Sequence, residues 1–80
     1  MTKKQAKQIG TLINNIKVAN HFIRQAGIDE LTKVEWTICE LEAEIALTEM
    51  GIPMATSIDK LRSHLKNSVA FRELLQREAA

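Results

Sequence analysis

The chain has 80 residues, of which 45% are apolar and 26% are charged, and its formal net charge is +1. This composition is typical of an ordered globular domain and excludes a disordered tail. No run approaches the roughly 18 apolar residues of a membrane span, and no apolar signal core follows the basic start. We therefore expect a cytoplasmic protein without membrane contact, in which the single cysteine, Cys39, is a reduced thiol.

The first predicted helix covers about residues 2–26 and ends at Gly27, whose freedom to adopt positive φ suits a helix terminus. Its apolar residues recur at helical spacing and form one arc, which we expect to face the core. The members of this arc are Ile9, Leu12, Ile13, Ile16, Ala19, Ile23 and Ala26. Val18 and Phe22 lie outside the arc and are apolar surface without an assigned neighbour.

The second predicted helix covers about residues 32–50 and has clear signals at both ends. Thr32 and Glu35 match the S/T-x-x-E capping box that marks a helix start. Gly51 is suited to the end of the helix, and Pro53 prevents its continuation.

This second helix has two apolar faces when residues advance by about 100° each. One stripe comprises Val34, Ile38, Leu41 and Ile45, and the other comprises Trp36, Cys39, Ala43, Ala46, Leu47 and Met50. Glu35, Glu42 and Glu49 separate the stripes at heptad spacing. The second stripe is either buried by the same chain, which makes this the central helix, or kept for a partner.

A third helix is predicted for about residues 57–66, with Thr56 or Ser57 as its cap. Its apolar stripe then shifts to a rotated face, which predicts a bend or break at Asn67-Ser68 and a short fourth helix over about 68–78. No segment shows the alternation of a β-strand. The predicted fold is an all-α compact bundle, formed by residues 1–80 as a single domain.

The charges are strongly segregated along the chain. Residues 1–28 carry five basic side chains and no acidic one, whereas residues 29–51 carry seven acidic side chains against Lys33. This pattern favours helices with complementary flanks; the alternative is that one of the two charged blocks faces a charged partner.

The favoured function is that of a non-enzymatic protein-interaction module, which acts sterically on a larger partner with a basic surface. The predicted contact residues lie on the second helix: Glu35, Trp36, Glu40, Glu42, Glu44, Leu47, Glu49 and Met50. By analogy, such a protein could inhibit a nucleic-acid-binding complex as phage-type inhibitors do. Homodimerisation through the second apolar face is the alternative use of the same helix.

A DNA-binding regulator is the second hypothesis, because residues 46–66 loosely resemble a helix-turn-helix. The side chains that would contact nucleic acid are Lys60, Arg62, His64 and Lys66. Ser57 stands where the usual pattern has an apolar residue, and the preceding helix is acidic, so nucleic acid is the less favoured partner.

Catalytic and metal sites have little support in the sequence. His21, Cys39 and His64 show no ligand spacing and no motif that pairs a nucleophile with a base. The three glycines stand alone, so no glycine-rich phosphate loop is present. We expect no enzyme activity, no cofactor and no metal.

Overall fold

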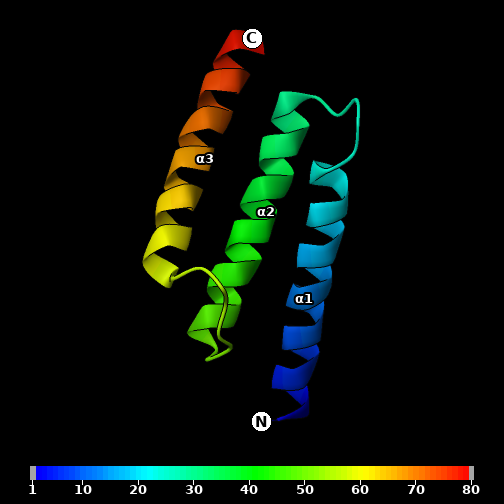
Figure 1. Ribbon diagram of the computed structural model, residues 1–80, viewed down its shortest axis with the longest axis vertical. Helices are drawn as coiled ribbons and strands as arrows, with labels where there is room; N and C mark the ends of the chain where they lie inside the picture. The colour runs from blue at the N-terminus through cyan, green and yellow to red at the C-terminus, as the bar shows by residue number, and fades with distance from the viewer. Residues whose placement is uncertain (1, 80) are drawn as a thin grey trace.

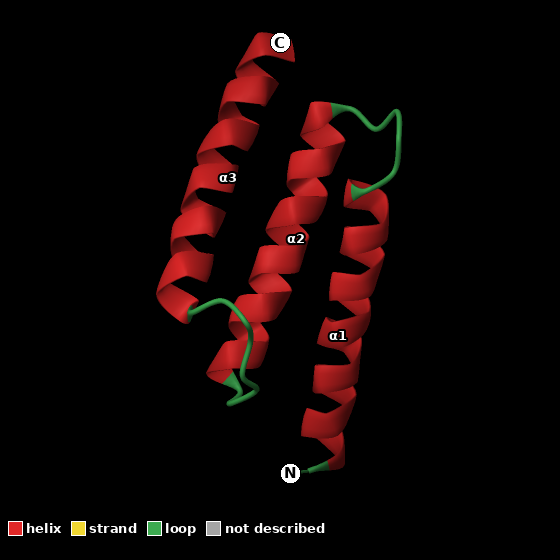
Figure 2. Ribbon diagram, viewed as in Figure 1, coloured by secondary structure: helices red, strands yellow, loops and turns green. Residues whose placement is uncertain are grey.

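Three helices make up the computed structural model, which describes residues 2–79. They are α1 (Lys3–Ile23), α2 (Glu30–Glu49) and α3 (Ile58–Ala79) (Figures 1 and 2). No strand occurs in this described part of the chain. The prediction of an all-α three-helix bundle is therefore confirmed.

Helix α1 begins with a capping box formed by Thr2 and Gln5, a T-x-x-Q pattern in the sequence. The backbone N–H of Gln5 donates to the Thr2 hydroxyl at 3.1 Å, and the Thr2 N–H donates to the Gln5 side chain at 3.0 Å. The helix ends at Ile23, three residues before the predicted end. Gly27 has φ of 81° and lies in the turn that leads to α2, rather than directly at the helix end.

Helix α2 begins two residues before the predicted start because Asp29 caps it. The Thr32 backbone N–H donates to the Asp29 carboxylate at 2.7 Å. This hydrogen bond to the ionised group, together with one from the Thr32 side chain, lowers the pKa of Asp29. The prediction that Thr32 is the cap is wrong, since a carboxylate three residues earlier satisfies the same backbone donors.

The end of α2 confirms the prediction made from Gly51. This glycine has φ of 87°, and its N–H donates to the Thr48 carbonyl at 3.0 Å. The Ile52 N–H donates to the Leu47 carbonyl at 2.9 Å. The two bonds form a Schellman motif, which satisfies carbonyls that the helix end leaves free.

Helix α3 is continuous, so the predicted break at Asn67-Ser68 and the separate fourth helix are wrong. Its start agrees with the predicted cap, since the Lys60 N–H donates to the Ser57 hydroxyl at 3.4 Å. Ser68 and Arg72 are half-buried and continue the stripe that Leu61 begins. The apparent shift in the apolar pattern arises because other apolar side chains of α3 face solvent.

Helix α2 lies between the other two helices, and both α1 and α3 pack along it (Figure 1). Within residues 2–79, no Cα atom of α1 lies within 8 Å of one in α3. The buried side chains are Ala19, Val34, Ile38, Leu41, Ala43, Leu47 and Leu61, five of which belong to α2. The sequence left open whether α2 is central, and the structure shows that the chain itself covers both of its apolar faces.

Candidate partner-binding surface

The eight residues predicted to contact a partner do not form one surface. Glu35, Glu42 and Glu49 are exposed on one side of α2, and we call them the acidic ridge. Leu47 is 0% exposed, so its predicted role as a contact residue is wrong. Because it is enclosed by the protein's own core, no partner can touch it in this structure.

Trp36, another predicted contact residue, also packs against a helix of its own chain. Its ring stacks on Phe22 of α1, with ring centroids 4.8 Å apart and planes 13° from parallel. This contact identifies the packing partner of Phe22, for which the sequence predicted no neighbour. Trp36 is therefore a half-buried part of the α1–α2 seam.

Met50 lies on the same side of the molecule as the acidic ridge. It borders a surface hollow between α1 and α2, together with Ala46, Leu12 and Thr11. Ala46 neighbours Glu42 and Glu49 on the helix surface, since residues three and four apart share a face. The hollow and the ridge therefore share one side of the layer of helices.

Glu40 and Glu44 lie on the opposite side of α2 from the ridge, one helical turn apart, and both are half-buried. Burial raises the pKa of Glu44 to about 7, and a hydrogen bond to the Glu40 carboxyl and its negative charge act in the same direction. All three effects raise the pKa, and no basic side chain is among the causes of the shift. Glu44 is a carboxyl group whose charge is incompletely compensated by its own chain.

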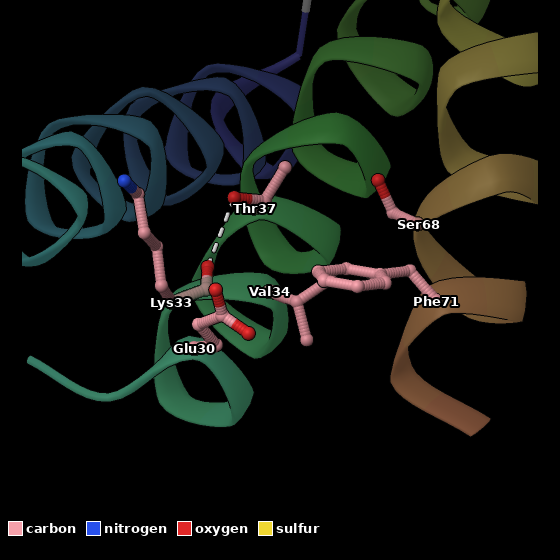
Figure 3. A pocket seen from close by; sticks show the side chains of 6 residues that line it. All are labelled: Glu30, Lys33, Val34, Thr37, Ser68 and Phe71. Carbon is pink, nitrogen blue, oxygen red and sulfur yellow. Dashed lines mark hydrogen bonds between the residues drawn. The ribbon is translucent and has the colours of Figure 1, made fainter. Parts of the chain in front are cut away.

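Helix α3 contributes apolar side chains to this same side. Phe71 is 45% exposed, and its ring points from α3 toward Val34 across a hollow of about 320 Å³ (Figure 3). Lys33 and Thr37 border the same hollow, and they adjoin Glu40 and Glu44 at helical spacing. Leu74, one turn beyond Phe71, is 54% exposed.

Helix α1 also contributes apolar side chains to the side of the molecule that carries Glu40 and Glu44. Its Thr11 borders the hollow on the ridge side, which fixes how α1 is turned relative to α2. Helical periodicity then places Ile13 and Ile16 on the other flank, toward Glu40 and Glu44. Ile13 is 40% exposed and Ile16 is half-buried, although both were predicted to belong to the core face.

We call this second side of the molecule the open face. Its residues are Ile13 and Ile16 of α1, Lys33, Glu40 and Glu44 of α2, and Phe71 of α3. Sequence reasoning identified only the two glutamates and grouped them with the acidic ridge. Helical spacing alone could have distinguished these two glutamates from the acidic ridge. They lie between the two apolar stripes, on the side of α2 opposite Glu35, Glu42 and Glu49.

The candidate nucleic-acid contacts do not form a helix-turn-helix. Helices α2 and α3 lie antiparallel along their length, with residues 50–57 between them (Figure 1). A helix-turn-helix instead joins two helices at about 90–120° through a turn of about 3–4 residues. The predicted contacts are exposed but divided between two sides of α3, with Lys60 and His64 on one side and Arg62 and Lys66 on the other.

Other kinds of site are equally unsupported by the geometry. Among residues 2–79, no three His, Cys, Asp or Glu side chains gather as metal ligands do. Cys39 is a half-buried free thiol in the second apolar stripe of α2. None of the helices in this range has the length and apolar character needed to cross a membrane.

Comparison of the chain with protein-family models, with curated proteins and with solved structures finds no match. The function must therefore be inferred from the surfaces that the three helices create.

The half-buried position of Glu44 predicts a pH-dependent stability. Because its pKa is raised from the ordinary value of 4.5 to about 7, the folded state holds a proton that the unfolded state has lost between these values. Stability is therefore lost as the pH rises through this interval. Glu44→Gln is expected to stabilise the protein at pH 8 by about 1 kcal/mol, a value reduced for solvent screening, and to have no effect below pH 4.

Thermal unfolding followed by circular dichroism measures this difference, for which we expect a rise in melting temperature of about 5 °C at pH 8. Lys17 of α1 and Lys60 and His64 of α3 lie level with the glutamate pair, so the measured difference includes any interaction of these groups with Glu44. Glu42→Gln on the ridge is the matched control and should give no pH-dependent difference. An equal effect of Glu44→Gln at low and high pH would contradict the role of its ionisation.

Proposed function

We propose that this protein is a non-enzymatic interaction module that acts sterically, by binding a larger protein on its open face. The observation that carries the proposal is the distribution of exposed apolar side chains. Ile13 of α1 and Phe71 of α3 are among the most exposed large apolar residues, and they flank the same side of α2. Large apolar side chains left exposed on one side of a protein are typical of a protein-binding site.

The proposal keeps the steric mechanism suggested by the sequence but moves the binding surface. Of the apolar contacts predicted on α2, Leu47 is buried and Trp36 is half-buried, whereas Met50 is exposed on the ridge side. Apolar side chains of the outer helices also remain accessible. Helix α2 contributes charge to the new surface through Glu40 and Glu44. Occupation of this face would block whatever surface of the partner is bound there, without chemical change to either protein.

Capture of partners from the cells that express the protein tests this proposal. The open-face variant combines Ile13→Ser with Phe71→Ser, and the control combines Val18→Ser with Met50→Ser on the ridge side. The four side chains have similar exposure, between 36% and 45%, so both variants remove comparable apolar surface. We expect capture to be lost only with the open-face variant; equal capture by both variants would contradict the proposal.

A further inference from the structure

The hollow that Met50 borders between α1 and α2, which we call the ridge-side hollow, has room for a small molecule. Its volume is about 640 Å³, within the roughly 300–1,000 Å³ of small-molecule sites. Leu12 of α1 and Ala46 and Met50 of α2 form its apolar lining. Leu12 and Ala46 are half-buried, and Met50 is 36% exposed. A side chain longer than the methyl group of Ala46 would occupy this space.

The charged groups that line the ridge-side hollow are all positive. Lys4 and Lys7 border it from α1, one helical turn apart, and no acidic side chain of the described residues lines it. The first turn of α1 contains no acidic residue, and the positive end of the helix dipole lies beside Lys4. An anion at this end of the hollow is therefore attracted by two lysines and by the helix dipole.

The acidic ridge lies on the same side of the molecule but outside the hollow. Glu49 lies about 60° from Ala46 and about 100° from Met50 around α2, turned away from α1. Glu42 lies one turn before Ala46, beyond the end of the hollow that is farthest from Lys4. Because both carboxylates are exposed, solvent and salt screen them. The ridge therefore favours an anion at the lysine end over one at the opposite end.

The spacing of the two ends suits an extended chain with one charged terminus. Lys4 and Leu12 are eight residues apart on α1, or about 12 Å. We propose that the ridge-side hollow binds a single-chain fatty carboxylate, with its carboxylate at Lys4 and Lys7 and its alkyl chain against Leu12 and Ala46. The site lies on the opposite side of α2 from the open face, so it goes beyond the proposed function.

Two other kinds of ligand fit the hollow less well. A small inorganic anion would contact the lysines but leave the apolar lining exposed to water. A nucleic acid strand would extend past the hollow and place its phosphates along the acidic ridge. A fatty carboxylate matches the lysine end and the apolar end at once.

Titration with two amphiphiles of opposite charge tests the proposal. Decanoate is the probe, and decylamine, which has an alkyl chain of similar length and is protonated at pH 8, is the control. Both are added to isotope-labelled protein below the concentrations at which they form micelles, and the backbone amides are followed by nuclear magnetic resonance. Decanoate should shift the amides of residues 4–12 and 46–50 and bind at least about fivefold more tightly than decylamine.

Lysine variants locate the charge preference. Lys4→Gln combined with Lys7→Gln should reduce the preference for decanoate to less than about twofold. Lys17→Gln combined with Lys60→Gln removes the same total charge from the other side of the molecule and should leave the preference unchanged.

A space-filling variant tests the position of the alkyl chain. Ala46→Leu occupies the hollow and should weaken decanoate binding at least about tenfold. Ala70→Leu adds the same atoms at an exposed position of α3 and should leave binding unchanged. Circular dichroism verifies that helix content is retained, and the lysine variants decide the question if Ala46→Leu does not fold.

Three results would overturn the proposal: decanoate produces no shifts, decylamine binds as tightly as decanoate, or decanoate binding survives the filling of the hollow. Shifts centred on Ile13 and Phe71 would place the amphiphile on the open face and would also overturn it. Partner capture depends on those two open-face residues and not on Lys4 or Lys7, so failure of this site would leave the proposed function standing.

Discussion

Leu47→Ala is expected to destabilise the protein by about 3 kcal/mol, because it leaves a cavity in the fully buried centre of α2. An 80-residue domain has a total stability of about 4–12 kcal/mol, so this loss is a large part of the whole. We expect the melting temperature to fall by at least about 12 °C in thermal unfolding followed by circular dichroism. The side chain is enclosed by the chain itself, so the effect should not require a partner.

Leu74→Ala is the matched control for this substitution. It removes the same atoms from a side chain of α3 that is 54% exposed. The expected change in the free energy of unfolding is within about 0.5 kcal/mol. Similar destabilisation by both variants would contradict the assignment of Leu47 to the core and of Leu74 to an exposed edge.

Trp36→Ala is expected to destabilise the protein by about 2–3 kcal/mol, through the loss of the half-buried ring and of its stack on Phe22. Chemical denaturation followed by circular dichroism measures the loss. Trp36→Phe keeps an aromatic ring at the seam and should recover more than half of it.

A double-mutant cycle with Phe22→Ala separates the stack from general burial. The two substitutions should show an interaction free energy of about 0.5–1.5 kcal/mol. Strict additivity would mean that the rings do not stabilise each other, and that α1 is held to α2 by other contacts.

Much of the fold could be predicted because its signals are local. Helical spacing of apolar residues identified all three helices, and Gly51 identified the end of α2. The predicted start of α2 was wrong because Asp29 and Thr32 both suit a cap, and the earlier carboxylate is the one that accepts the backbone hydrogen bond. The predicted break in α3 was wrong because the rotated apolar face that suggested it includes Phe71 and Leu74, which are exposed on one continuous helix.

The candidate site was harder to predict because it depends on how separate helices are placed. The sequence showed that α2 has two apolar faces but not how α1 and α3 are placed against them. That placement leaves Glu40 and Glu44 half-buried and the ridge glutamates exposed. It also leaves Ile13 accessible, although its spacing in α1 is that of a core residue.

The most direct test of a protein-binding open face is site-specific photo-crosslinking in the cells that express the protein. A photo-reactive phenylalanine analogue replaces Phe71 on the open face or, as the control, Val18, which is similarly exposed on the ridge side. The proposal predicts a crosslinked adduct with a larger protein from position 71 and none from position 18. An adduct only from position 18, an adduct only with a second copy of the chain, or no adduct from position 71 would contradict it.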